Sequence, residues 1–77
     1  MQVVLDRITF DTNIMGGRAC IRGLRITVSQ VVNLVANGMS NSEILRDYPY
    51  LEEEDIRQAL RYVAQLAEEE VHPVPSR

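Results

Sequence analysis

Apolar residues recur at helical spacing in three segments of the chain, and capping signals mark the ends of these segments. Between residues 28 and 37, valine and leucine side chains recur three and four positions apart, as they do on the buried face of a helix. Thr27 is followed three residues later by Gln30, which is the capping-box spacing. Gly38 stands where a left-handed C-terminal cap is favoured. The pattern predicts a first helix over residues 28–37.

Two further helices follow. Ser40 with Glu43 repeats the capping-box spacing, and Pro49 disfavours helical geometry in the residue before it, so a short second helix ends near Tyr48. The third and longest helix spans about residues 53–70, with a predicted buried stripe of Ile56, Ala59, Leu60, Val63, Leu66 and Ala67. We predict one core, formed by Val31, Leu34, Val35, Ile44, Leu45, Ile56, Leu60 and Val63.

The N-terminal third has a β-type pattern. Residues 3–11 predict a strand with Ile8 and Phe10 as its apolar positions, and residues 11–13 predict a turn. The β-like segment 19–28 is interrupted at Arg22-Gly23. Either a tight turn folds residues 19–21 against 24–26, or Gly23 is a bulge in one longer strand.

The predicted fold class is therefore mainly α, with a short N-terminal β element followed by a three-helix, helix-turn-helix-like bundle. We expect a single domain over residues 1–71. Residues 72–77 contain two prolines and no periodicity, so we expect them to form a flexible tail.

Size and composition limit the class of protein. A chain of 77 residues buries only about 60% of its unfolded surface, so we expect a homodimer that adds to a small core and covers the N-terminal β edge. The single cysteine, Cys20, fits a reducing compartment. No run approaches the ~20 apolar residues of a membrane span, and no basic segment leads into an apolar one at the N-terminus. These features predict a cytoplasmic protein without a membrane partner.

Charge divides the chain. Residues 1–27 carry four arginines against two aspartates, a net charge of +2, whereas residues 28–77 carry four arginines against nine carboxylates, a net charge of −5. The third helix would occupy the recognition position of a helix-turn-helix domain, but it begins with carboxylates at positions 52–55, which repel a phosphate backbone. The candidate nucleic-acid-binding residues are instead Arg18, Arg22 and Arg25. Alternatively they are solvated, or one of them pairs with an acidic residue of the third helix.

Catalytic chemistry is not indicated. No histidine lies near a serine or cysteine nucleophile in the sequence, and metal-ligand spacings are absent. His72 falls in the predicted tail. We therefore predict no enzymatic activity, no catalytic residues, no metal and no cofactor.

Four ordered motifs resemble one family. They are IRGLRITV at 21–28, GMS at 38–40, ILRDYPYL at 44–51 and EDI at 54–56. Together they resemble the bacterial family known as domain of unknown function 433, and the resemblance extends over residues 8–67. It implies a homeodomain-like helical core. The family often has threonine or serine where this chain has Glu52, so the third helix here lacks a hydroxyl cap.

The resemblance also implies partners. Members of the family are predicted antitoxins paired with a nuclease-like protein toxin of the PIN type, and operator DNA is a possible second partner. We expect the acidic C-terminal half to meet a basic or mixed toxin surface, with Tyr62, Leu66 and Val71 as apolar anchors. The alternative is a structural dimerising adaptor that binds no nucleic acid.

Overall fold

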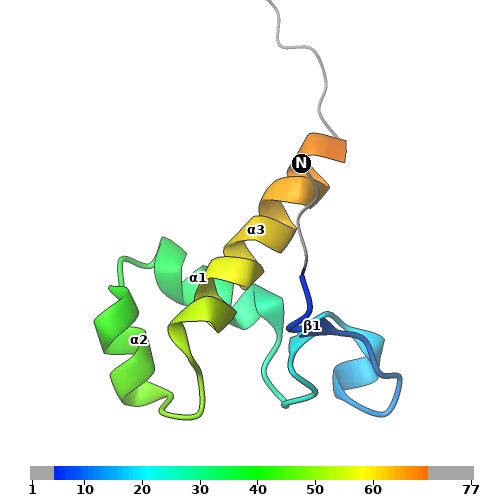
Figure 1. The fold of residues 1–77 in the computed structure, drawn as a ribbon, viewed down its shortest axis with the longest axis horizontal. Coiled ribbons are helices and arrows are strands. Elements are labelled where there is room, and N and C mark those ends of the chain that lie inside the picture. The colour runs from blue at the N-terminus through cyan, green and yellow to red at the C-terminus, as the bar shows by residue number, and fades with distance from the viewer. Residues whose placement is uncertain (1–4, 70–77) are drawn as a thin grey trace, which may run out of the picture.

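The computed structural model describes residues 5–69, and Figure 1 shows a helical body with a small β element at one side. The elements are, in order, β1 (Ile8–Thr9), the 3-10 helix η1 (Met15–Gly17), β2 (Cys20–Ile21), α1 (Val28–Ala36), α2 (Asn41–Asp47) and α3 (Glu53–Glu69). In Figure 1, α2 and the β element lie on opposite sides of α1 and α3, and the second half of α3 projects beyond the rest. The predicted fold class is confirmed.

Local capping fixes the ends of α1. Thr27 Oγ1 accepts a hydrogen bond from the Gln30 amide at 3.0 Å, and Gln30 Oε1 accepts one from the Thr27 amide at 3.0 Å. Gly38 has φ +94°, and the Met39 amide donates to the Leu34 carbonyl at 3.2 Å. This left-handed ending satisfies carbonyl groups that the last turn leaves free. The predicted bounds of the first helix are confirmed to within one residue.

The other two helices also begin where the sequence predicts. Ser40 and Glu43 form the second capping box, with side-chain-to-amide bonds of 2.8 and 3.1 Å. At the start of α3, where a hydroxyl cap is missing, Asp55 Oδ2 accepts from the Glu52 amide at 2.8 Å. A carboxylate in the first turn also suits the positive end of the helix dipole.

The segment after β2 turns back on itself. Arg22 and Gly23 have φ values of +49° and +70°, as in a type I′ turn, and the Leu24 amide donates to the Ile21 carbonyl at 2.8 Å. The Ile21 amide then donates to the Ile26 carbonyl at 3.1 Å. Of the two alternatives, the tight turn forms and the bulged strand does not. We call residues 18–27 the hairpin.

The first strand is shorter than the predicted 3–11. Residues 3 and 4 lie outside the described part, and β1 contains only Ile8 and Thr9, which pair antiparallel with Ile21 and Cys20. The ladder ends at Arg7, whose carbonyl still accepts from the Arg22 amide at 2.8 Å but whose amide donates to the Gln58 side chain of α3. The turn predicted at residues 11–13 forms, with the Asn13 amide donating to an Asp11 carboxylate oxygen at 2.8 Å.

The core joins the three helices and the two strands, but two predicted members are missing. Its buried apolar side chains are Ile21, Ile26, Val28, Val31, Ile44, Leu51, Ile56 and Ala59, while Leu34, Val35 and Leu45 are partly buried against them. Leu60 and Val63 are 38% and 37% exposed, so their assignment to the core was wrong. Leu66 and Ala67 are exposed as well, so the stripe predicted to be buried on the third helix is buried only at Ile56 and Ala59. Buried Asp55 and Gln58 occupy the inward side of α3 instead, which turns Leu60 and Val63 outward. Within residues 5–69, no helix has the length and apolar character needed to cross a membrane.

Candidate functional site

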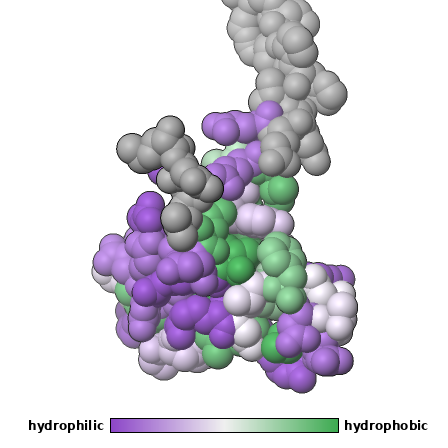
Figure 2. Space-filling model, turned by 45° about the vertical axis from the view of Figure 1, so that its right-hand side comes forward, coloured by the Kyte–Doolittle hydropathy of each residue, from purple (hydrophilic) through white to green (hydrophobic). Residues whose placement is uncertain are grey.

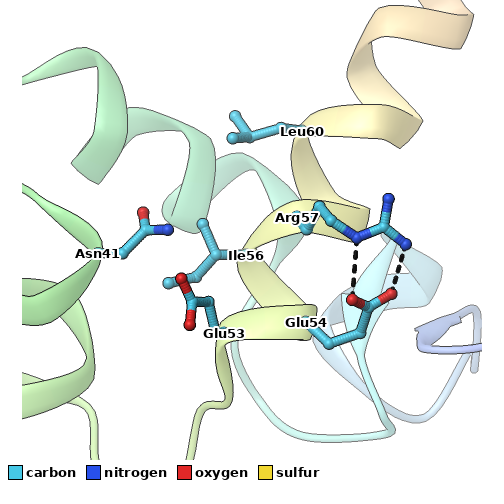
Figure 3. Close-up of a pocket in the computed structure, with 6 residues that line it drawn as sticks. All are labelled: Asn41, Glu53, Glu54, Ile56, Arg57 and Leu60. Carbon is cyan, nitrogen blue, oxygen red and sulfur yellow. Dashed lines mark hydrogen bonds and ion pairs between the residues drawn. The ribbon is translucent and has the colours of Figure 1, made fainter.

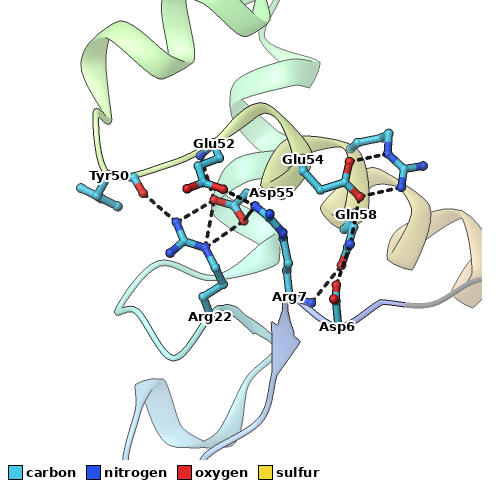
Figure 4. A network of polar contacts seen from close by, with 9 residues as sticks. Asp6, Arg7, Arg22, Tyr50, Glu52, Glu54, Asp55 and Gln58 are labelled. Atoms are coloured by element: carbon cyan, nitrogen blue, oxygen red, sulfur yellow. Dashed lines mark hydrogen bonds and ion pairs between the residues drawn. The ribbon is translucent and has the colours of Figure 1, made fainter.

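A buried carboxylate on α3 holds the N-terminal β element in place. Asp55 is fully buried, and Figure 4 shows the side chains of Arg7 and Arg22 converging on it. Arg22 Nε and Nη2 donate to the two oxygens at 3.0 and 2.9 Å, and Arg7 Nη1 donates at 3.0 Å. Arg22 also donates to the Tyr50 carbonyl at 2.7 Å. We call these side chains the Asp55 network.

The network satisfies the buried charge. Burial by itself raises the pKa of the Asp55 carboxyl, but hydrogen bonds from Arg22, a backbone amide and Arg7 outweigh it and hold the pKa below its ordinary value. The hydrogen bond between Arg22 and Asp55 also raises the pKa of the Arg22 guanidinium. A buried carboxylate so fully paired is a structural anchor rather than a reactive acid.

A second set of polar contacts extends the network along α3. Gln58 accepts from the Arg7 amide at 2.9 Å and donates to Asp6 at 2.9 Å and to Glu54 at 3.0 Å. Glu54 also forms an ion pair with Arg57 at 2.6 Å. Hydrogen bonds from Arg57 and Gln58 lower the pKa of Glu54 to about 2.

Acid is therefore expected to destabilise the domain. A carboxyl group whose pKa is lower in the folded state contributes stability above its unfolded pKa and loses that contribution as the pH falls through its folded pKa. For Asp55 and Glu54, the free energy of unfolding should be constant from neutral pH to about 5 and should fall below that value. Urea denaturation at successive pH values measures this free energy. The Glu54→Gln variant shows how much of its pH dependence comes from Glu54, the more exposed of the two carboxylates. Equal stability at neutral pH and in acid would contradict the assignment.

The structure separates the three hairpin arginines. Arg22 pairs with Asp55, which confirms that one of them pairs with an acidic residue of the third helix. Arg18 and Arg25 are exposed. At the start of α3, Figure 3 shows Glu53 beside a hollow of about 400 Å³ that Asn41 also lines, while Glu54 is turned toward Arg57. The exposed cations of the hairpin and the recognition position of α3 are therefore distinct surfaces of unlike charge.

An apolar groove lies between the start of α1 and the second half of α3. It has a volume of about 460 Å³, and its lining includes both anchor residues predicted within the described range, Tyr62 and Leu66. The other lining residues are Arg18, Ala19, Thr27, Val28, Ser29, Val32, Asn33 and Val63. Val71, the third predicted anchor, lies outside the described residues. Leu66 is 40% exposed, so the groove is open to a partner.

The surface around this groove is mixed in character. Its lining combines apolar side chains with Arg18, Ser29 and Asn33. Figure 2 shows the same kind of mixture on one face of the molecule, where hydrophobic residues are bordered by hydrophilic ones. Sequence reasoning identified the α3 wall of the groove but missed Val28 and Val32, which form its α1 wall. Their helical spacing of four residues indicates a shared face, but only the packing of α1 on α3 shows that this face stays partly open.

The family follows from a match that covers most of this architecture. The model of the family described as Protein of unknown function (DUF433) matches residues 8–63, from β1 into the second half of α3. The chain belongs to the DUF433 family. The matched range includes Arg22 and Asp55 but ends before Leu66.

A solved structure of the same family has a similar fold. The crystal structure of a DUF433 member protein from Anabaena variabilis superposes with a TM-score of 0.73 at 35% sequence identity. The similarity covers 82% of this DUF433 chain and 62% of the Anabaena chain, so the present chain spans less than two thirds of that relative. A comparison with curated proteins finds no match.

Proposed function

We propose that this DUF433 chain is a protein-binding module that acts as the antitoxin component of a toxin–antitoxin pair. In this proposal, the groove between α1 and α3 receives an apolar segment of a nuclease-like toxin. The observation that carries the proposal is the groove itself, because its apolar walls stay open on a domain too small to leave many such side chains uncovered. The resemblance that implies toxin partners supports the choice of toxin.

The lining of the groove favours an amphipathic helix as the bound segment. Its volume falls in the range of about 300–1,000 Å³ that is common for ligand sites. Two of its walls are helices, and the apolar face of a third helix can lie along such walls and insert residues three and four positions apart. The rim carries the exposed side chains of Arg18, Ser29 and Asn33. A matching helix would present a carboxylate toward Arg18.

Operator DNA is the less favoured part of the antitoxin role. Arg22 uses its guanidinium within the domain, so Arg18 and Arg25 are the two hairpin cations left for phosphate contacts. The carboxylates of Glu53 and Glu54 oppose a duplex at the start of α3. Since two phosphate contacts are few for a specific complex, protein binding is the better-supported activity.

The groove can be tested by binding to the product of the adjacent gene, purified as a nuclease-like toxin. Arg18→Glu and Leu66→Ser are each expected to weaken binding at least about tenfold, because each changes a side chain at the groove. Isothermal titration calorimetry measures the dissociation constant. Circular dichroism checks that both variants remain folded, as expected for exposed positions.

Two variants serve as matched controls. Arg25→Glu makes the same charge change on an exposed hairpin residue away from the groove, and Tyr50→Ala removes an apolar side chain that is 51% exposed elsewhere. Both should bind like the unmodified chain. If all four variants bind equally, the groove is not the toxin site. If the unmodified chain does not bind the toxin at all, the proposal fails in favour of the structural adaptor.

A further inference from the structure

The outward side of α3 carries a second apolar face, which shares one residue with the groove. Its residues are spaced i, i+3, i+4 and i+7, as on a helix that packs against another helix: Leu60, Val63, Ala64 and Ala67. All four are exposed, with Leu60 at 38%. Val63 is the only one of them that also lines the groove. This face begins beside the body, where Leu60 lines the same hollow as Asn41, and it continues along the part of α3 that projects in Figure 1.

A row of charges runs beside this face and changes sign along the helix. Arg57 and Arg61 precede Ala64, and Glu68 follows it, at spacings that place all of them along one side of the helix. Arg57 is already paired with Glu54. Among residues 5–69, Arg61 forms no ion pair. The row is thus positive toward the body and negative toward the end of α3.

A hollow of about 280 Å³ lies at the end of this surface that is nearer the start of α3. Arg57, Leu60, Arg61 and Ala64 line it, which is the arrangement of four side chains that accepts one side chain from a facing helix. The small Ala64 side chain lets a second helix approach closely. The face therefore combines a hollow for one side chain, an apolar stripe, and a row of charged residues that is positive at one end and negative at the other.

We propose that the partner of this face is a second copy of the chain, with the two α3 helices antiparallel about a two-fold axis near Ala64. Arg61 and Glu68 are seven residues apart, which is about 10 Å along the helix. A two-fold axis between them places Arg61 opposite Glu68 of the partner subunit. The same axis repeats this pair on the other side, so the surface is complementary to itself.

The charges exclude the parallel arrangement, which would place Arg61 opposite the same arginine of the second copy. Like charges at such positions oppose pairing, whereas opposite charges at positions flanking the apolar seam set helix orientation. The interface is one short helix face, so we expect a weak dimer that forms at micromolar concentrations or above. This proposal is independent of the toxin site, because its charge pair lies outside the groove.

A charge exchange tests the antiparallel pairing. Arg61→Glu and Glu68→Arg are each expected to weaken the dimer at least about tenfold, because each places like charges opposite one another twice. The double variant Arg61→Glu/Glu68→Arg restores opposite charges and should recover the dimer. Sedimentation equilibrium over a range of concentrations measures the dissociation constant, and circular dichroism checks the helix content.

Leu60→Asp adds a variant that does not depend on the charge pair. It should abolish the dimer while leaving the domain folded, since Leu60 is on the surface. A matched control is Arg25→Glu, which alters an exposed arginine of the hairpin and should leave the dimer unchanged. A strictly monomeric unmodified chain, a dimer that all the variants retain, or a folded double variant that stays monomeric would each overturn the proposal. None of these results depends on toxin binding.

Discussion

Replacing Asp55 by alanine is expected to lower the free energy of unfolding by about 3–5 kcal/mol, the range for breaking a buried ion pair by removal of one partner. The carboxylate accepts hydrogen bonds from Arg7, Arg22 and the Glu52 amide, and all of these bonds are lost at once. The Arg7 guanidinium is left with its bond to Glu52, and the Arg22 guanidinium is left with its bond to the Tyr50 carbonyl. The hairpin would also lose its attachment to α3. Urea denaturation followed by circular dichroism measures the change.

Three variants show whether the loss of stability comes from the Asp55 network. Arg22→Ala is expected to cost less than Asp55→Ala, because Asp55 then keeps its hydrogen bonds from Arg7 and the Glu52 amide. The double variant should be less destabilised than the sum of the two single variants, because they remove one shared interaction. Glu54→Gln, at a pair on the surface, should have a much smaller effect than Asp55→Ala. Additive losses for Arg22 and Asp55 would rule out the coupling.

Truncating Ile56 to alanine is the second large effect, at about 2–5 kcal/mol, which is the range for removing a large aliphatic side chain from a core. Ile56 is completely buried among side chains of the helices and the hairpin. The neighbouring core cannot close the cavity without moving α3, to which the Asp55 network is attached. Thermal and urea unfolding both measure the loss.

Leu60→Ala is the matched comparison, on the same helix and with the same type of truncation. Because Leu60 is 38% exposed, its loss should be about 1 kcal/mol or less. The measurement belongs at low protein concentration, where self-association contributes little. If Leu60→Ala costs as much as Ile56→Ala, the orientation of α3 in the structure is wrong.

The helix bounds could be predicted because their causes are local. Thr27 with Gln30, Ser40 with Glu43, and Gly38 each act within one helical turn, so their spacing in the sequence is sufficient evidence. The rotation of α3 about its own axis has a different cause. Gln58 and Asp55 bind segments 33 to 52 residues away, and no local pattern shows that two polar residues take the inward positions from Leu60 and Val63.

The candidate site could also be predicted only in part. That Tyr62 and Leu66 share a surface of α3 could be predicted, because they are apolar residues four positions apart on the second half of that helix, and their role as partner anchors stays a prediction. The role of Arg22 could not be fixed, since a cation in a tight turn is equally compatible with phosphate binding and with an internal partner. Its partner, Asp55, is distant in the sequence, so only the folded chain decides between these alternatives.

The Asp55 network also sets the order in which the domain can be assembled. Arg22 is synthesised 33 residues before Asp55, the carboxylate that it binds. Arg7 is synthesised 51 residues before Gln58, whose side chain accepts a hydrogen bond from the Arg7 amide. Two-residue strands are too short to persist alone, whereas the helices form from contacts between near neighbours. The β element leaves the ribosome before the helices, but the side-chain contacts that fix it to the domain form only after α3 has been made.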